Sequence, residues 1–323
     1  MNDYNRHENE TQFEWKLRLC KAKINKEIDL DWQEIVEVLG LDISADHLRK
    51  TAYGMLEYDE YIHGDSVVGT TILSLSDLHY PFAKPLETFK NYIGKVDVLQ
   101  MNGDILDCMQ LSRFNKSYRT SPIEEIINGR QYIIDLIEMI KPKKVLVNHG
   151  NHELRMGHYL AKNLDNELQE LMPETAFDYI FLDGFTHYDR KTKAKVKYAP
   201  LCEVFDDIEI EYTGTWYSQY KDVLFCHPKA FASSPLRTAE KALYWFRNEG
   251  FDFKALVMSH THRVGSYKIG NSMIYEQGCC CESGKMKYND GQLINSQKEG
   301  FMFICLDKDG HVIEDKTKIV TLN

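Results

Sequence analysis

Side chains that can bind metal ions recur along this sequence, each time directly after a short apolar run. Five such fragments follow one another: Asp77-Leu78-His79, Gly103-Asp104, Gly150-Asn151-His152-Glu153, His227-Pro228 and His260-Thr261-His262. Carboxylate, imidazole and amide groups are ligand types that intermediate divalent metals accept. If the fold brings the fragments together, their chemistry is metal-assisted catalysis.

Each fragment alone is weak evidence. An Asp-x-His or His-x-His pair arises readily by chance, and a single histidine such as His227 after a strand is usually structural. The joint pattern is stronger, because all five fragments occupy the same position relative to an apolar run. Their seven potential ligands are too many for one ion. Two ions need a shared ligand, and a carboxylate is suited to bridge them.

Strands alternating with helices must position these fragments. The apolar runs predict strands at 67–75, 96–101, 144–147, 223–226 and 255–258, with further strands at 273–275, 301–305 and 312–320. Helical patterns lie near 84–93, 121–140, 155–170 and 236–249. This alternation predicts an α/β layer structure with buried strands. Because strand ends on one edge of such a sheet converge on one crevice, we expect the five fragments to meet there.

Residues 1–64 have a different pattern and predict a small all-α module, followed by a catalytic domain over 65–323. Helical periodicity covers 11–28, a short stretch after Asp31 and a third stretch after Ser44, with a linker at 63–66. The turn at Gly40 suggests a helix-turn-helix-like module, and a plain three-helix element is the alternative. Residues 1–65 hold fifteen acidic and eight basic side chains. Contact with DNA and contact with a partner protein both stay open.

The bulk composition restricts the function classes. The chain has 323 residues, 43% of them hydrophobic, and a formal net charge of −10. That charge disfavours indiscriminate attraction to nucleic acid or to an anionic membrane. The polar N-terminus lacks the shape of a signal peptide, and no apolar run approaches the roughly 20 residues that span a bilayer. We expect a cytoplasmic protein without membrane contact, in the host cytoplasm if a phage encodes it.

Eight cysteines include the consecutive Cys279, Cys280 and Cys281. Adjacent cysteines make a poor disulfide framework, so reduced thiols are expected. A zinc site at these three residues is the alternative, although the spacing matches no familiar zinc knuckle.

The motif series as a whole resembles that of calcineurin-like metallophosphoesterases, over roughly residues 70–320. The resemblance implies a two-sheet sandwich flanked by helices (αββα), beside the small all-α N-terminal module. It implies one metal held by Asp77, His79, Asp104 and His262. The second metal would be held by Asp104, Asn151, His227 and His260, so that Asp104 bridges.

The same resemblance implies the chemistry. Two divalent cations, for which Mn²⁺ is expected and Fe, Zn, Ni and Mg are alternatives, would clamp the phosphate and activate a bridging hydroxide. His152 would assist the leaving group. Asp107 and Glu153 would orient histidines, and Arg263 would orient ligands or contact substrate.

Departures from the family pattern narrow the substrate. Cys108 follows Asp107 where protein phosphatases carry a phosphate-gripping Arg, which disfavours a phosphoprotein substrate. Ser259 replaces a usual Gly, which is tolerated if its φ is not positive. Arg263 directly follows His262, and in this the chain resembles family members that cut phosphodiesters, including the nuclease-type branch. The N-terminal module together with this domain resembles phage and bacterial chains of the DNA-repair exonuclease type.

We therefore expect a phosphodiesterase that acts on nucleic acid, as a DNA nuclease does. A phosphodiesterase or phosphatase for small or cyclic nucleotides is one alternative, and a DNA-binding protein with a vestigial phosphoesterase domain is another. The basic stretch at 190–197 is either a phosphate-backbone contact or a solvated hairpin.

Overall fold

The chain divides into two compact units, Met1–Val67 and Val68–Asn323. The computed structural model describes residues 4–7, 10–63, 68–113, 120–286 and 297–322. Most of the expected linker at 63–66 therefore lies outside the described residues. No helix in the described ranges is both long and apolar enough to cross a membrane.

The first unit consists of α1 (Gln12–Ile24), α2 (Trp32–Leu39) and α3 (Ala45–His63). Thr11 with Glu14 and Asp31 with Glu34 form capping boxes that begin α1 and α2. Gly40 ends α2 in the left-handed conformation, at φ 61°. The helices share a core of their own: Leu19, Cys20, Ile35, Val36, Leu39, Leu48 and Ala52. A small N-terminal helical unit is thus present, and its contact with DNA stays a prediction.

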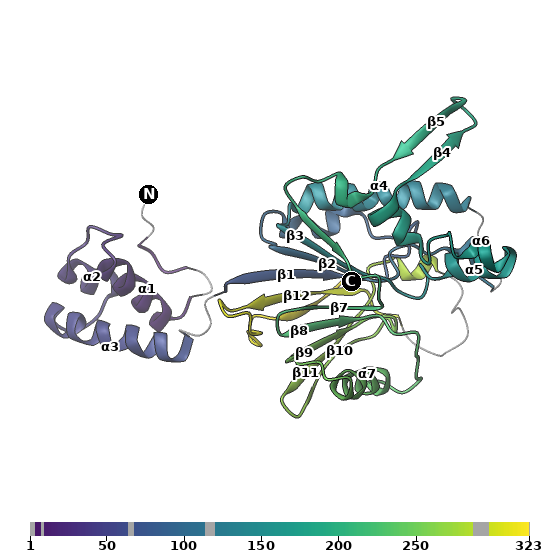
Figure 1. The fold of residues 1–323 in the computed structure, drawn as a ribbon. Helices are drawn as coiled ribbons and strands as arrows, with labels where there is room; N and C mark the ends of the chain where they lie inside the picture. Colours follow the sequence, from purple (N-terminus) through teal and green to yellow (C-terminus); the bar gives the residue numbers. More distant parts are fainter. Residues whose placement is uncertain (1–3, 8–9, 64–67, 114–119, 287–296, 323) are drawn as a thin grey trace. The chain divides into compact units, whose positions relative to one another are not determined.

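Two large sheets form the core of the second unit (Figure 1). The first has the order β13-β12-β1-β2-β3-β6, built from Lys318–Thr321, Gly300–Leu306, Thr70–Leu75, Val98–Asn102, Lys144–Asn148 and Glu209–Tyr212. The second has the order β10-β11-β9-β8-β7, built from Val264–Ile269, Ser272–Gln277, Ala255–Met258, Val223–Cys226 and Tyr217–Tyr220. Strands β1, β2, β3 and β6 run parallel, as do β8, β9 and β11.

The sheets pack face to face, and helices cover both outer faces. One apolar cluster between the sheets includes Ile72 and Leu146 of the first and Phe225 and Val257 of the second. Helix α4 (Pro122–Ile140) covers the first sheet and α7 (Arg237–Asn248) covers the second, as Figure 1 shows. This arrangement confirms the expected helix-flanked sandwich.

Shorter elements depart from the predicted pattern. The helix expected near 155–170 is two helices, α5 (Arg155–Asn163) and α6 (Asn166–Gln169). The helix expected near 84–93 is a 3-10 helix, Leu86–Tyr92. The strand expected at 312–320 is confined to β13, although Val312 makes an isolated bridge with Leu306. The other short helical turns are Met109–Leu111, Asp178–Asp183, Leu201–Glu203 and Ser283–Lys285.

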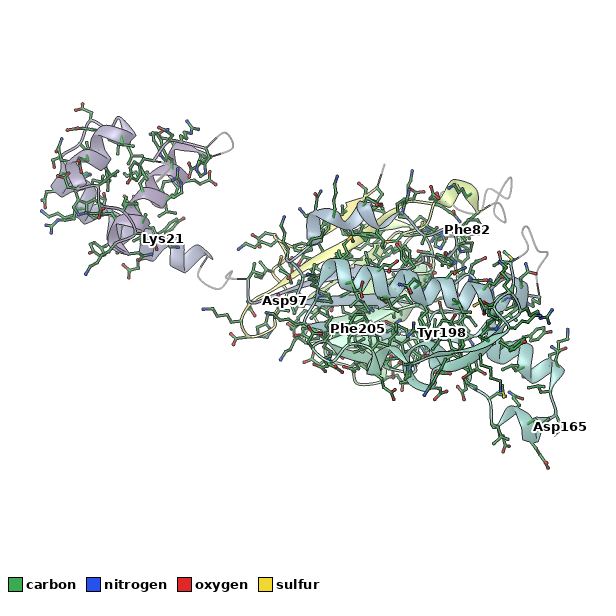
Figure 2. The ribbon with its side chains drawn as sticks, turned by 90° about the horizontal axis from the view of Figure 1, so that it is seen from above. Lys21, Phe82, Asp97, Asp165, Tyr198 and Phe205 are labelled. Atoms are coloured by element: carbon green, nitrogen blue, oxygen red, sulfur yellow. The ribbon has the colours of Figure 1, made fainter. Side chains whose placement is uncertain are left out.

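The basic stretch at 190–197 belongs to a separate two-stranded hairpin, β4 (Phe185–Asp189) and β5 (Ala194–Tyr198). Tyr198, labelled in Figure 2, anchors its base against α4, where the Arg130 guanidinium lies 5.8 Å from the centre of its ring. Arg130 also donates to the Ala199 carbonyl at 2.6 Å. The lysines at 191, 193, 195 and 197 are exposed.

Candidate metal centre

The loops after β1, β2, β3, β8 and β9 bring their polar side chains together. Three groups of donor atoms each lie within 4.8 Å: Asp77, His79 and His262; His79, Asp104 and His152; and Asp104, His227 and His260. Six of the seven expected ligands, and His152, therefore share one site. His79 and Asp104 each belong to two of these groups, so the three groups form one connected cluster of donor atoms.

The distances between donors suit shared cations. Nε2 of His262 lies 3.0 Å from Oδ1 of Asp77 and 3.2 Å from Nε2 of His79. Nε2 of His227 lies 3.1 Å from Oδ2 of Asp104. Metal–ligand bonds of about 2.1 Å place neighbouring octahedral ligands roughly 3 Å apart.

The seventh expected ligand, Asn151, follows Gly150 in the β3 loop. Its Oδ1 atom is buried and has no hydrogen-bond partner in the described part of the chain. A buried amide oxygen without a partner is costly, and a cation would satisfy it. The donor set therefore fits divalent metals.

Strained backbone presents most of these ligands. Five of them have left-handed φ values: Asp77 50°, His79 47°, Asp104 51°, His260 80° and His262 53°. Such a conformation is uncommon outside glycine and costs on the order of 1–3 kcal/mol per residue. Backbone hydrogen bonds between the β1 and β2 loops hold the conformation of the first two ligands. The amides of Asp77 and His79 donate to the carbonyls of Gly103 and Asp104, at 3.1 and 2.9 Å.

Glycine allows the β2 and β3 loops to touch. A Cβ at Gly150 would lie 2.1 Å from Oδ1 of Asp104. Gly103 has a φ of 75°, and a Cβ there would lie 2.6 Å from the Gly150 nitrogen. A larger residue at Gly150 would push the Asp104 carboxylate away from the other donors, and one at Gly103 would clash with the Gly150 backbone and the His227 ring.

Charges within the buried site shift its pKa values. Burial alone would raise the pKa of Asp77 and of Asp104, but neighbouring histidines hold both well below the usual range. Burial would likewise lower the pKa of His79 and of His227. The carboxylates beside them, Asp107 first for His79 and Asp104 first for His227, raise each to about 9. The site thus stabilises ionised carboxylates paired with imidazoles.

His152 lies against Asp107. Its Nδ1 is 2.9 Å from the Asp107 carbonyl oxygen, 3.0 Å from the Asp107 Oδ1 and 3.2 Å from Nδ1 of His79. Its amide donates to Oδ1 of Asp104 at 2.8 Å. Burial lowers the pKa of His152. The imidazole therefore sits beside the donor groups, with its Nδ1 directed at Asp107.

Sequence reasoning missed Arg155, the first residue of α5. Its Nη2 lies 2.8 Å from Nε2 of His152, and its Nη1 donates to the Asp107 carbonyl at 2.6 Å. The signal was its spacing three residues after His152, because the turn before α5, closed by the Arg155 amide donating to the His152 carbonyl at 3.0 Å, brings the two side chains together.

Glu153 binds backbone amides. Its carboxylate accepts from the amides of Asp104, Leu106 and Gly150, at 3.0, 3.0 and 2.8 Å. Burial, reinforced by the charge of Asp104, raises the pKa of Glu153 to about 7. The expectation that Glu153 orients a histidine is therefore corrected: its partners are the amides of two ligand loops, which it holds together.

The ends of β2 and β9 orient His227. Its Nδ1 lies 2.7 Å from the Asn102 carbonyl oxygen, which leaves Nε2 directed at Asp104. Ser259 accepts a hydrogen bond from Nδ2 of Asn102 at 2.7 Å. Its φ is not positive. The serine at this position therefore joins the two strand ends without backbone strain.

Arg263 is buried and positions an exposed aromatic ring. Its guanidinium donates to the carbonyls of Ser233 and Ser234, at 2.7 and 3.0 Å, and lies 5.3 Å from the centre of the Phe231 ring. The Phe231 ring is 45% exposed, and its centre is 6.3 Å from that of His260. An accessible aromatic face therefore lies beside the donor groups.

A cavity of about 520 Å³ opens next to the same loops. Its lining includes His149, Trp216, Pro228, Lys229, Lys241 and Trp245. His149 precedes Gly150, and Pro228 follows His227. Two indole rings and two ammonium groups thus surround a space adjacent to the candidate metal ligands.

Comparison with known proteins gives one family match and several structural ones. The model of the calcineurin-like phosphoesterase family matches residues 70–264. Vacuolar Protein Sorting 29 from Cryptosporidium parvum is 14% identical, covers 79% of this chain and 98% of its own, and has a TM-score of 0.39. An archaeal phosphodiesterase is 13% identical, covers 78% of this chain and 99% of its own, and has a TM-score of 0.36.

A metallophosphoesterase from Sphaerobacter thermophilus is 12% identical over 79% of this chain and 88% of its own, with a TM-score of 0.36. The comparison with curated proteins finds no match.

Proposed function

This chain belongs to the calcineurin-like phosphoesterase family, and we propose that it is a dinuclear metal-dependent phosphodiesterase whose substrate is a nucleic acid. One observation carries the proposal: two groups of donors, Asp77 with His79 and His262 and Asp104 with His227 and His260, meet at the ends of β1, β2, β8 and β9. Donor atoms of His79 and Asp104 lie within 4.8 Å of each other and join the two groups. A decayed site would have lost donors. The alternative of a vestigial domain is therefore disfavoured.

This geometry and the unpartnered Oδ1 of Asn151 support the proposed ligand sets. Asp77, His79, Asp104 and His262 would hold one cation. The other would be held by Asp104, Asn151, His227 and His260, with Mn²⁺ as the proposed metal in both positions. When bound, the cations supply positive charge that polarises the phosphate and makes water acidic near neutral pH.

His152 and Arg155 act on the substrate in this proposal. Asp107 accepts a hydrogen bond from Nδ1 of His152 and stabilises the protonated ring, which would then give its Nε2 proton to the leaving oxygen. Arg155, next to that Nε2, contacts the phosphate oxygens. It supplies the guanidinium that the chain lacks at Cys108.

The exposed ring of Phe231 supports a nucleic-acid substrate. Bases stack on accessible aromatic side chains, and the stacking contributes about 1–3 kcal/mol per base with little sequence preference. A ring beside His260 would receive the base next to the scissile phosphate.

A small or cyclic nucleotide is the second candidate substrate, favoured by the cavity. Its volume, about 520 Å³, is in the range of small-molecule sites, and its indole rings suit a nucleobase. Its two lysines suit further phosphates.

The N-terminal helices are proposed to contact DNA or a partner protein. Comparing the DNA affinity of the full chain with that of residues 68–323 tests this role, and equal affinities would contradict contact with DNA.

Hydrolysis of bis-p-nitrophenyl phosphate with added Mn²⁺ tests the activity itself. We expect turnover that EDTA abolishes and Mn²⁺ restores. Undiminished turnover in EDTA would contradict the proposal. Single-stranded DNA, double-stranded DNA, RNA and cyclic nucleotides, compared under the same conditions, separate the two substrate classes.

A further inference from the structure

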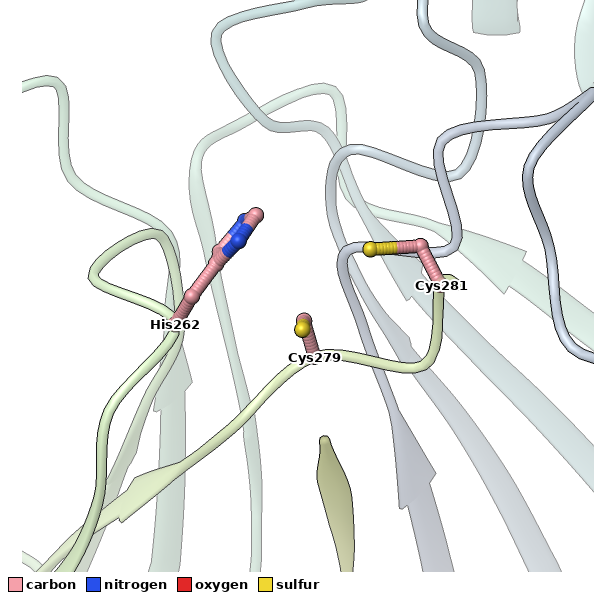
Figure 3. A group of neighbouring side chains, drawn as sticks. All are labelled: His262, Cys279 and Cys281. Atoms are coloured by element: carbon pink, nitrogen blue, oxygen red, sulfur yellow. The ribbon is translucent and has the colours of Figure 1, made fainter. Parts of the chain in front are cut away.

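Two cysteine thiols lie next to His262, outside the ligand sets assigned above. The donor atoms of His262, Cys279 and Cys281 all lie within 4.8 Å of one another, and all three residues are buried. Figure 3 shows the three side chains grouped in a triangle, with Cys279 below His262 and Cys281 in this view. The cluster therefore combines one nitrogen donor with two sulfur donors.

Isolated bridges on either side of a bend at Cys280 explain why two of the three consecutive thiols face His262. Cys279 pairs with Glu299 and Cys281 pairs with Ala83, so the residue between them points the other way. Cys280 points into the core beneath α4, where its Sγ donates to the Gly300 carbonyl at 3.4 Å. Cys279 and Cys281 consequently share the other side, where they pack near Phe82.

One ring nitrogen of His262 makes no contact in the hydrolytic centre. Its Nε2 faces Oδ1 of Asp77 at 3.0 Å and Nε2 of His79 at 3.2 Å. Its Nδ1 is buried and has no hydrogen-bond partner among the residues that the structure describes. The residue is only 6% exposed, so water does not readily satisfy that atom. With Nε2 in the hydrolytic centre, Nδ1 can bind a further cation only as part of an imidazolate, so metal binding there releases the ring proton.

Lys298 fixes the spacing between the imidazole and the nearer thiol. Its amide donates to the His262 carbonyl at 2.8 Å, and its carbonyl accepts from the Cys279 amide at 3.0 Å. The same carbonyl accepts from Sγ of Cys279 at 3.4 Å. The backbone around the cluster is therefore held by direct bonds.

We propose that His262, Cys279 and Cys281 form a third metal site, which binds Zn²⁺. Thiolate and imidazole are the preferred ligands of zinc, whereas carboxylate-rich sites suit Mn²⁺. With Zn–S bonds of about 2.3 Å, ligands of a tetrahedral site lie roughly 3.8 Å apart, so small side-chain rotations would close the cluster around an ion. The fourth position is left to water. The site goes beyond the proposed hydrolysis and shares only His262 with it.

Binding of Co²⁺, a spectroscopic substitute for zinc, tests the site in the full-length reduced protein. Metal-free protein is titrated with Co²⁺ under a phosphine reductant, and bound metal is counted after gel filtration. We expect a thiolate-to-cobalt charge-transfer band in the near ultraviolet, with three bound equivalents. The double variant Cys279→Ser/Cys281→Ser should lose the band and one equivalent, and competing Zn²⁺ should abolish the band in the unaltered protein.

Cys280→Ser is the matched control, because its sulfur faces the core, and it should keep the band. A folded unaltered protein without the band, or a double variant that retains it, would overturn the proposal. The first of these outcomes does not depend on how well any variant folds. Asp104→Asn separates the two proposals: it should bind less metal in the hydrolytic centre and keep the band.

Discussion

The Arg155 guanidinium lies 2.8 Å from Nε2 of His152, beside the cluster of candidate metal ligands. The same guanidinium donates to the Asp107 carbonyl, so α5 presents a fixed cation beside the proposed general acid. A cation in this position suits the negatively charged oxygens of a phosphodiester.

Replacing Arg155 should weaken substrate binding. Loss of a hydrogen bond to a charged group costs about 1.5–3 kcal/mol, so Arg155→Met should lower kcat/KM for a diester roughly 10- to 150-fold. Steady-state kinetics with bis-p-nitrophenyl phosphate measure the change. Lys162→Met, on the exposed end of the same helix, is the control. A variant with unchanged kcat/KM would exclude contact between Arg155 and the phosphate.

Replacing His152 should slow the chemical step while the metals stay bound. A positioned general acid contributes about 10²- to 10⁴-fold, so His152→Ala should lower kcat by that factor. Metal analysis should give the same content as in the unaltered protein, because the proposed ligands are intact. His158→Ala, on the exposed surface of α5, should change neither quantity. If His152→Ala releases metal, the residue is a ligand.

Much of the site could be predicted from the sequence because buried parallel strands are short apolar runs, and their ends locate the ligands. Two strands with a weaker apolar pattern were not predicted. Strand β7 has the sequence Tyr-Ser-Gln-Tyr and strand β6 has the sequence Glu-Ile-Glu-Tyr, and each is the edge strand of a different sheet. Their polar composition reflects one-sided burial.

Contacts made by loops were beyond the reach of sequence patterns. Phe231 acquires its place beside His260 through Arg263, and nothing in the spacing of these residues indicates the contact. Cys279 and Cys281 acquire a third neighbour, His262, only because β10 and β11 pair as a hairpin.

Removing the Phe231 ring should affect polymer substrates selectively. If a base stacks on this ring, Phe231→Ala should raise KM for a single-stranded oligonucleotide about 5- to 150-fold, which corresponds to 1–3 kcal/mol. Turnover of bis-p-nitrophenyl phosphate should change far less. Tyr244→Ala removes another exposed aromatic ring, on α7, and serves as the control. Equal KM values for Phe231→Ala and the unaltered protein would argue against stacking.

The buried carboxyl of Glu125 should make stability depend on pH. Its Oε1 accepts from the Cys108 amide at 2.5 Å, and burial, reinforced by the charge of Asp107, raises its pKa from 4.5 to about 7. As pH rises between these values, the unfolded chain ionises first. The stability contribution present below about pH 4.5 is therefore lost as pH rises through about 7.

Glu125→Gln imitates the protonated side chain and should remove this loss. Relative to the unaltered protein, its free energy of unfolding should increase between about pH 4 and pH 8, by up to about 3 kcal/mol. Denaturant unfolding in EDTA at both pH values measures the difference, with the exposed Glu124→Gln as control. A difference that does not vary with pH would show that Glu125 ionises normally.

Anomalous diffraction from crystals grown with Mn²⁺ tests the central claim most directly. The account predicts two manganese peaks in the second unit, one among Asp77, His79 and His262 and one among Asn151, His227 and His260, with the Asp104 carboxylate between them. Asp104→Asn crystals should lose occupancy at both peaks. A single peak, or manganese bound away from these side chains, would contradict the account.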